Sequence, residues 1–309
     1  MKVGRYQGSD GAERLGAVLQ QNGSLQVLDL FAAASAHGVK NFPTTMDAFI
    51  ASGERALERG RSAIAWTQRE GHTDWLQDEA SVKWMLPVRV RNCINGGRNF
   101  GAHTAEMQEY WTKQGAKLHS EIPMGFIKLA SVMVPHRSTV QRPTGCEWFD
   151  YEVEAAAVIG SPALNVNERD ALKSIFGYTI LNDLSAREVQ RKEMANHAIL
   201  LGKNYPGFGP LGPWIVTADE VPDPSELEVR LTVNGQQRQR ASCKDLIFSF
   251  ARMVSHWSKM GLDRGDLITT GAPGGVAIAM PDPMLFYLKA GDVVCAEVSR
   301  VGVLETFIA

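Results

Sequence analysis

Apolar and polar positions near the N-terminus follow a pattern that predicts a β-hairpin. The apolar segments 15–19 and 25–30 lie on either side of Asn22-Gly23, a dipeptide typical of tight hairpin turns. We therefore expect two paired strands at the start of the chain.

The region after this hairpin has the periodicity of a helix. The periodic segment covers residues 44–68, and Thr44 or Thr45 is expected to cap its N-terminus. The polar stretch from Arg69 to Ala80 is interpreted as the connection to the rest of the protein. These patterns predict a small amino-terminal domain of hairpin and helix over residues 1–85.

The longer part of the chain, residues 86–309, is predicted to be rich in strands. Two further strand pairs are expected, one around Asn234-Gly235 and one at the C-terminus, over the segments 227–233, 292–299 and 301–308. The clearest helix is predicted over residues 244–260, where apolar residues recur every three or four positions. Because strands and helices do not alternate as βαβ units, the mixture predicts a strand-dominated α+β fold.

Composition and charge narrow the class of protein. Lys and Arg number 32 and Asp and Glu number 34, so the formal net charge of −2 argues against nucleic acid or an anionic membrane as the main partner. No apolar run is long enough for a signal peptide or a membrane span, and the four cysteines form no Cys-x-x-Cys pair. Segment 271–275 is glycine-rich but lacks the nucleotide-binding fingerprints. We expect a cytoplasmic protein with reduced thiols.

Two carboxylates occur two positions apart in a predicted strand. Glu152 and Glu154 lie in the alternating segment 149–159, and residues two apart on a strand project from the same face. Carboxylates that are close together in a partly buried place repel each other, and a cation relieves that repulsion. With Asp183 as a third oxygen ligand, the pattern predicts a site for Mg²⁺, with Mn²⁺ or Ca²⁺ as alternatives.

A solvated strand face with alternate glutamates would give the same pattern. The run 155–160 that follows is apolar on both faces, which indicates that the strand enters the interior. Asp183 follows the apolar run 178–181, at a predicted strand end. Both observations favour the metal site over the solvated face.

A second candidate group lies upstream, in the segment Arg98–Glu106 that follows Gly96-Gly97. If this segment opens a helix, His103 and Glu106 lie on one face, so that the carboxylate can orient the imidazole and raise its basicity. The glycines are consistent with a mobile lid and equally with an ordinary loop.

Taken together, these motifs strongly resemble the fumarylacetoacetate hydrolase family. The resemblance covers essentially all of residues 86–309 and rests on ordered segments, which are 99–106, 126–128, 150–160, 177–190, Lys203, 209–213 and 265–276. It implies a catalytic domain of mixed β-sandwich roll type, a homodimer, and a small amino-terminal domain.

The resemblance also implies roles for individual residues. It assigns Glu152, Glu154 and Asp183 as metal ligands, and His103 and Glu106 as the pair that activates water. Contacts to substrate oxygens are implied for Arg187, Gln190, Lys203 and Thr270, and Lys203 is also counted among the catalytic residues. A cation, an arginine and a lysine in one cavity suit a small anionic 2-oxo acid substrate.

The implied activity is divalent-metal-dependent hydrolysis of a carbon–carbon bond in a 2,4-dioxo acid such as an acylpyruvate or fumarylpyruvate. The alternative is a decarboxylase or keto–enol isomerase of 2-oxo dicarboxylic acids in aromatic catabolism. A third hypothesis is a non-catalytic protein that binds metal and oxo acid. The chain departs from the family at Pro206, where many members carry an acid that would position Lys203.

Overall fold

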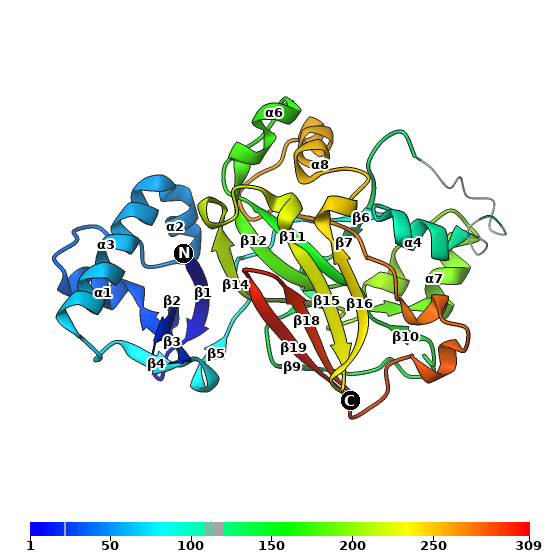
Figure 1. Cartoon of the computed structure of the whole chain (residues 1–309), viewed down its shortest axis with the longest axis horizontal. Coiled ribbons are helices and arrows are strands. Elements are labelled where there is room, and N and C mark those ends of the chain that lie inside the picture. The colour runs from blue at the N-terminus through cyan, green and yellow to red at the C-terminus, as the bar shows by residue number, and fades with distance from the viewer. Residues whose placement is uncertain (22, 109–111, 113–119) are drawn as a thin grey trace.

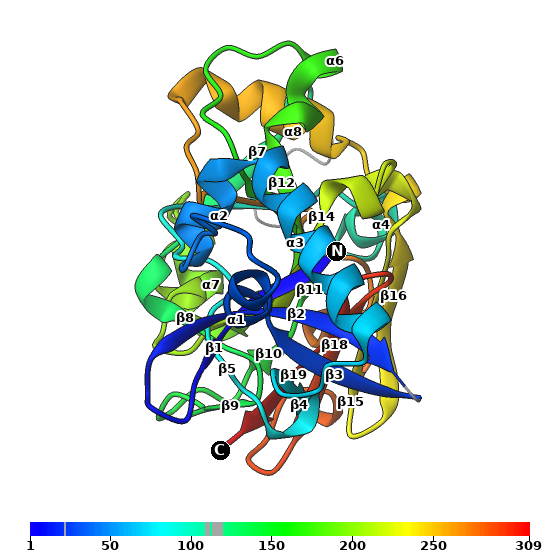
Figure 2. The ribbon, with the colours of Figure 1, turned by 90° about the vertical axis from the view of Figure 1, so that its left-hand side faces the viewer.

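The computed structural model describes residues 1–21, 23–108, 112 and 120–309. Figure 1 shows a small lobe, formed by the N-terminal part of the chain, beside a larger body. The small lobe contains the elements β1 Lys2–Gln7, β2 Glu13–Gln21, β3 Ser24–Asp29, α1 Leu30–Ala36, α2 Met46–Ser52, α3 Glu54–Glu70, β4 Leu76–Asp78 and β5 Lys83–Trp84. Figure 2 shows its helices beside β1, β2 and β3.

The predicted N-terminal hairpin is present. Strands β2 and β3 pair antiparallel from Gly16 opposite Asp29 to Gln21 opposite Ser24. Gly23 has a φ of 83°, a left-handed conformation that suits glycine, whereas Asn22 lies outside the described residues.

The single helix predicted over residues 44–68 is wrong, because two helices occupy this region. Thr45 caps α2, its hydroxyl accepting a hydrogen bond from the backbone of Ala48 at 3.2 Å. The chain then turns at Gly53, whose φ of 54° is incompatible with a continuing helix, and α3 begins at Glu54.

The small lobe shares a sheet with the larger body. Strand β1 pairs with β14, Gly209–Thr217, at Lys2 opposite Val216 and Val3 opposite Ile215. Segment 69–80 is more than a connection, since it contains β4, which pairs with β3. The predicted domain boundary at residue 85 stays a prediction.

The large sheet of the described chain runs in the order β4-β3-β2-β1-β14-β12-β11-β17-β6-β7, with β5 beside β1 and β8 beside β14. Its further strands are β6 Cys93–Gly97, β7 Met124–Lys128, β8 Met133–Val134, β11 Val153–Ile159, β12 Ile175–Asn182 and β17 Leu267–Thr269. All residues of β11 and β12 are buried, which agrees with the apolar run that follows Glu154.

A second sheet packs against this one. It runs in the order β16-β15-β18-β19-β9, with bounds β9 Ser138–Val140, β15 Glu228–Val233, β16 Gln236–Ser242, β18 Val293–Val298 and β19 Gly302–Ile308. Asn234 and Gly235 both have positive φ, at 51° and 77°, as a hairpin turn of this kind requires. Both predicted strand pairs in this region are confirmed.

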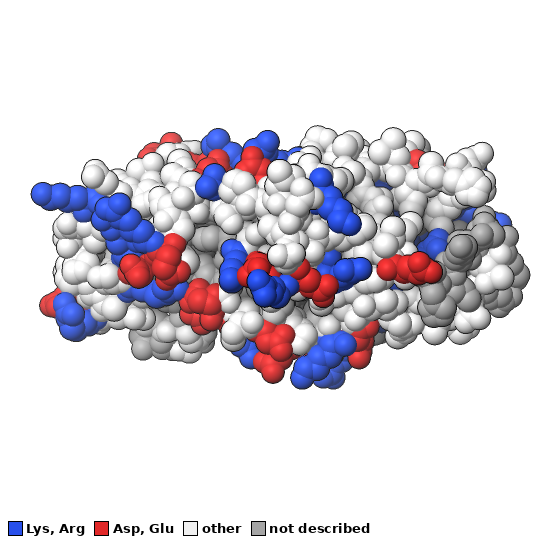
Figure 3. Space-filling view, turned by 90° about the horizontal axis from the view of Figure 1, so that it is seen from above, with Lys and Arg blue, Asp and Glu red and all other residues white. Residues whose placement is uncertain are grey.

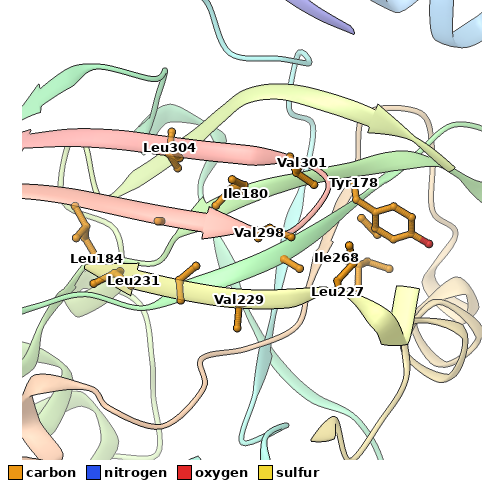
Figure 4. Packing of buried hydrophobic residues seen from close by; sticks show 14 of the residues in the cluster. Tyr178, Ile180, Leu184, Leu227, Val229, Leu231, Ile268, Val298, Val301 and Leu304 are labelled. Carbon is orange, nitrogen blue, oxygen red and sulfur yellow. The ribbon is translucent and has the colours of Figure 1, made fainter. Parts of the chain in front are cut away.

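The main hydrophobic core fills the space between the two sheets. Ile180 and Ile268 come from the large sheet, and Val229, Val298 and Leu304 come from the second sheet (Figure 4). Alternate buried residues along β15 and β18 give the second sheet one apolar face. Two packed strand layers with few helices confirm the strand-dominated α+β class.

The helix predicted over residues 244–260 is shorter than expected. Helix α8 spans only Phe250–Trp257, and the side chain of Ser249 caps it. The backbone amides of Ile247 and Phe248 donate to the main-chain and side-chain oxygens of Asn99, at 2.8 and 2.7 Å, so these residues cannot join the helix. The tertiary contact overrides the helical periodicity.

The remaining described α-helices are α4 Gly101–Glu106, α6 Glu168–Ala171 and α7 Arg187–Met194. Helices α4 and α7 lie at the same end of the larger body, and α6 lies beside α8 (Figure 1). Among the described helices, none is long and apolar enough to cross a membrane. Charged residues of both signs are interspersed over the face shown in Figure 3.

Candidate active site

The predicted strand over residues 149–159 is interrupted where its carboxylates begin. Phe149 and Asp150 form β10, which pairs with β13, Ser185–Ala186, in a separate two-stranded sheet. The chain then joins the large sheet at Val153 as β11, so Glu152 lies at the change of partner instead of within a strand. Its backbone amide is held by the side chain of Asn182 at 3.0 Å.

The three predicted metal ligands meet at this change of partner. Glu152, Glu154 and Asp183 each present a carboxylate oxygen, and these oxygens lie within 4.8 Å of one another. Asp183 directly follows β12, and its amide donates to the main-chain oxygen of Glu152 at 2.8 Å. All three residues are buried, with exposed fractions of 5%, 1% and 0%. We call this group the carboxylate floor.

The three carboxylates have different electrostatic surroundings. Burial favours the neutral form of Glu152, but Lys203, Arg187 and His103 outweigh it and lower the pKa of this carboxyl to about 2. Burial and the charges of Asp183 and Glu152 raise the pKa of Glu154 well above its ordinary value. Glu154 is therefore the member of the floor whose negative charge is least compensated by the protein.

Lys203 and Lys128 bring positive charge to the floor. Lys203 Nζ donates to Glu152 Oε2 at 2.6 Å and to Asp183 Oδ2 at 2.7 Å. Lys128 Nζ lies 2.7 Å from Asp183 Oδ1, but its hydrogen bonds go to the main-chain oxygens of Lys203 and Phe208. Asp183 Oδ1 is therefore paired by charge and accepts no hydrogen bond from the described residues.

Arg187, the first residue of α7, joins the floor to Asp150. Its Nε donates to Asp150 Oδ2 at 2.7 Å and its Nη2 donates to Glu152 Oε1 at 2.6 Å. Its third contact is Nη1 to Gln190 Oε1, at 2.8 Å. The neighbouring carboxylates of Asp150 and Glu152 raise the pKa of the Arg187 guanidinium against the effect of burial. Arg187 is thus a fixed, charged part of the site.

The carboxylate floor fits a hard divalent cation. Its ligand atoms are all oxygens, they converge, and one of them, Asp183 Oδ1, is buried without a hydrogen bond. A divalent cation at this point would offset the repulsion that acts on Glu154. Oxygen-only ligand sets suit Mg²⁺, Mn²⁺ or Ca²⁺ better than zinc.

Helix α4 holds the second predicted group. His103 Nδ1 lies 2.9 Å from Glu106 Oε1, so the two side chains are in hydrogen-bond contact as the spacing predicts. The amide of Gly275 donates to both carboxylate oxygens of Glu106, at 3.0 and 3.1 Å. The glycine-rich segment 271–275 thus helps to fix the position of Glu106. The sequence did not predict this contact.

A cavity connects the dyad and the floor. Its polar lining is Arg98, His103, Glu152, Arg187, Gln190 and Lys203. The other side is apolar and includes Met107, Met124, Phe126, Met194, Ile199 and Ile278. The cavity can therefore hold a small anion against the floor while its carbon chain contacts apolar side chains.

Of the residues predicted to contact substrate, Gln190 lines the cavity, whereas Thr270 is not among the lining residues. Gln190 lines the cavity and accepts from Arg187. Thr270 is fully buried, where its hydroxyl accepts from the amide of Ala155 at 3.2 Å and donates to the main-chain oxygen of Gly271 at 3.0 Å. Substrate roles for Arg187, Gln190, Lys203 and Thr270 stay predictions.

Sequence reasoning assigned no role to Lys128, Asp150 or Asn99. Lys128 is a charged residue at the end of an apolar strand, and Asp150 is the first residue of the acidic motif. The sequence shows both residues but does not show which residues they contact. Asn99 holds the start of the α4 segment, its side-chain nitrogen donating to the main-chain oxygens of Phe248 and Thr270, both at 3.0 Å. Lys203 needs no acid at Pro206, because the floor itself holds its ammonium group.

Comparisons with known proteins identify the family of this chain. The family model described as fumarylacetoacetate hydrolase C-terminal matches residues 92–309. A mitochondrial oxaloacetate tautomerase of Xenopus laevis is 32% identical over 308 residues, which is 99% of this chain and 89% of that protein. An oxaloacetate tautomerase of Bacillus subtilis is 30% identical over 277 residues, covering 87% of this chain and 88% of its own length.

The fold is also found among solved structures. A 5-carboxymethyl-2-hydroxymuconate delta-isomerase of Mycobacterium smegmatis superimposes with a TM-score of 0.73 at 28% identity, and the match covers 100% of this chain and 99% of that one. The similarity therefore includes the small lobe as well as the larger body.

Proposed function

Because this chain belongs to the fumarylacetoacetate hydrolase family, we propose that it is an enzyme that catalyses keto–enol isomerisation of a 2-oxo dicarboxylic acid. Family membership supports an enzymatic role more than a non-catalytic binding role. The tautomerases and the isomerase among its relatives favour isomerisation over the hydrolysis that the sequence suggested first.

The observation that carries this proposal is that one cavity is lined by both Glu152 of the carboxylate floor and His103 of the dyad. Isomerisation of a 2-oxo acid needs a proton moved at the carbon beside the carbonyl and stabilisation of the enolate that results. The dyad can move the proton. The floor is able to hold the cation that stabilises the charge.

A divalent cation, Mg²⁺ in our proposal, would be held by Glu152, Glu154 and Asp183 and would supply Lewis-acid polarisation of the 2-oxo group. Lys203 and Arg187 position Glu152 and Asp183 through the contacts described above. Met107, Met194 and Ile278 give the same cavity an apolar wall.

His103 is proposed to exchange the proton. The carboxylate of Glu106 accepts hydrogen bonds, so in the neutral imidazole His103 Nδ1 would donate to it, which would place the lone pair on Nε2. Nε2 then takes the proton from carbon 3 of the keto form and returns it to the opposite end of the enolate system, on oxygen. The Gly275 amide keeps Glu106 oriented during this exchange.

Hydrolysis of a carbon–carbon bond is the second candidate function. The same dyad supports it, because a histidine held by a carboxylate can activate water as readily as it can move a carbon-bound proton. The substrate would then be a 2,4-dioxo acid such as an acylpyruvate.

One experiment separates these reactions. We propose to follow oxaloacetate, an acylpyruvate and fumarylpyruvate by proton NMR in D₂O with Mg²⁺ present. Isomerisation exchanges the hydrogens at carbon 3 of oxaloacetate without new products, hydrolysis gives two cleaved acids, and decarboxylation gives pyruvate. If the protein does not accelerate hydrogen exchange of oxaloacetate above the rate in buffer but does cleave an acylpyruvate, the protein is a hydrolase and the isomerase assignment is wrong.

The homodimer, the cytoplasmic location and the identity of the ion stay predictions. Sedimentation of the purified protein tests the dimer. Competition between Mg²⁺ and Mn²⁺ for the demetallated protein tests the ion.

A further inference from the structure

Strand β16 of the second sheet contributes one buried polar side chain, and this side chain lies between the two halves of the site. Gln239 is 1% exposed, whereas the other residues of this described strand are exposed or half-buried. It is not among the described residues that line the cavity, so we do not expect it to contact a bound substrate. No role was expected for it from the sequence.

The side-chain oxygen of Gln239 holds the backbone between two carboxylates of the floor. Gln239 Oε1 accepts a hydrogen bond from the amide of Val153 at 2.9 Å, and Val153 lies between Glu152 and Glu154 in the chain. The amide of Glu152 is held in turn by the side chain of Asn182, at 3.0 Å. Two side-chain amides therefore hold the backbone from which both glutamates project.

The side-chain nitrogen of Gln239 holds the segment that orients the dyad. Gln239 Nε2 donates to the main-chain oxygen of Pro273 at 3.1 Å. Two residues further on, the amide of Gly275 donates to both carboxylate oxygens of Glu106. Gly275 has a φ of 95°, and a Cβ at this position would collide with the main-chain oxygen of Arg238. This segment thus lies directly against β16.

A side-chain amide supplies what these two contacts require. The Val153 amide needs an acceptor and the Pro273 carbonyl needs a donor, and a carboxamide offers both. Val153, Pro273 and Gln239 are all buried, so losing either contact leaves a buried backbone group without its partner. Gln239 is therefore a link between the floor and the segment that holds Glu106.

We propose that Gln239 is a positioning residue that holds the carboxylate floor and the dyad in their places relative to each other. It acts on the floor through Val153 and on the dyad through Pro273 and Gly275. This inference rests on the proposed function, because proton transfer depends on where the base lies relative to a substrate held at the floor. A misplacement of about 1 Å can cost about 10²-fold in rate.

The test is Gln239→Met, which keeps most of the volume and removes both hydrogen bonds. Calorimetry should show that the affinity for Mg²⁺ falls by about 10-fold, since the backbone at Val153 is no longer held. At saturating Mg²⁺, kcat for deuterium exchange of oxaloacetate should fall by about 10-fold to 100-fold. The control is Gln237→Met, in an exposed residue of the same strand that does not line the cavity, and it should leave both quantities unchanged.

A second substitution separates positioning from a general structural defect. In a Glu106→Ala protein, Gly275 has no carboxylate to hold, so adding Gln239→Met should lower kcat little further. A structural defect would lower kcat by the same factor in both backgrounds, and that result overturns the proposed role. Gln239→Asn is one methylene shorter and cannot span both partners, so it takes the place of Gln239→Met if the methionine variant does not fold.

Failure of the proposed function can be distinguished from failure of this inference. If the wild type does not exchange oxaloacetate but cleaves an acylpyruvate, the isomerase is wrong, and the same variants are compared by cleavage, which uses the same dyad. A wild-type kcat in Gln239→Met overturns the link to the dyad. A wild-type Mg²⁺ affinity in the same variant overturns the link to the floor, and this measurement needs no turnover.

Discussion

The two halves of the site are built in different ways. The carboxylate floor, Glu152, Glu154 and Asp183, lies among fully buried strands, where Lys128, Lys203 and Arg187 contact it. The dyad lies on α4, a helix of six residues, and the Glu106 side chain is 26% exposed. The floor places opposed charges in the protein core, whereas the dyad depends on one short helix and on the amide of Gly275.

Because of this difference, we expect substitutions in the floor and substitutions in the dyad to affect different properties of the protein. Buried charges that lose a partner cost several kcal/mol, so changes to the floor should alter both folding and metal binding. Residues of a short and partly exposed helix contribute less to folding. Changes to the dyad should therefore affect the rate while the fold and the metal site remain.

The largest expected effect comes from removing the cation. Chelation should abolish activity and lower the melting temperature, because an ion that binds only the folded state stabilises it by about 2.7 kcal/mol at 100 times its Kd. Mg²⁺ or Mn²⁺ should restore both properties. Full activity in demetallated protein, verified by elemental analysis, contradicts the metal assignment.

Glu154→Gln is the matched variant for this test. It removes the carboxylate whose charge is least compensated, so the metal-free variant should be more stable than the metal-free wild type. Added Mg²⁺ should no longer raise its melting temperature. Equal stabilisation of variant and wild type by Mg²⁺ would exclude Glu154 as a ligand.

The next effect in size concerns the dyad. His103→Ala should lower turnover by about 10² to 10⁴, the usual contribution of a general base, while the affinity for Mg²⁺ changes little. Glu106→Gln should cost less, since an amide can still accept from His103. Calorimetric Mg²⁺ titration beside the kinetic assay measures both quantities. Loss of Mg²⁺ binding in His103→Ala would show that the two halves of the site are not independent.

Lys128→Met tests the contribution of the carboxylate floor to folding. Methionine keeps most of the volume but removes one of the two buried cations that pair with Asp183, and breaking such a pair costs about 3–5 kcal/mol. The free energy of unfolding of metal-free protein, from urea denaturation, is the measurement. Lys173→Met is the control, because this exposed lysine pairs with Asp170 at the surface and should have little effect. Similar stability of the two variants would contradict the buried role of Lys128.

The smallest effect concerns a buried group outside the cavity lining. Burial, reinforced by Arg137 and opposed by Glu79, lowers the pKa of His136 to about 4 from an ordinary value of 6.5. Its Nδ1 accepts a hydrogen bond from the amide of Glu305 at 3.0 Å, which is possible only when Nδ1 carries no proton. Between pH 6.5 and 4 the unfolded chain therefore takes up a proton that the folded protein does not.

The stability contributed by neutral His136 is complete above pH 6.5 and is lost as the pH falls towards 4. The slope from this residue is at most about 1.4 kcal/mol per pH unit. His136→Asn keeps an acceptor but does not titrate, so its stability should fall less over this window. Parallel curves for variant and wild type, in metal-free protein, would show that His136 does not titrate as proposed.

Local patterns in the sequence determined much of this protein. The hairpins β2–β3 and β15–β16 follow from glycine-containing turns between apolar segments, because a tight turn and period-two alternation are properties of neighbouring residues. The contact between His103 and Glu106 follows from spacing on one helical turn. The carboxylates 152, 154 and 183 could be named from motif order, although Glu152 proved to lie outside the strand.

Only the tertiary structure decided which cations meet those carboxylates and where helices end. Lys128 and Lys203 are far apart in the sequence and meet at Asp183, and no local pattern encodes that contact. Asn99 takes the amides of Ile247 and Phe248 away from a helix that their periodicity favours. Periodicity reports which face of a segment is apolar, whereas the partner of a buried polar group depends on which distant segments the fold brings together.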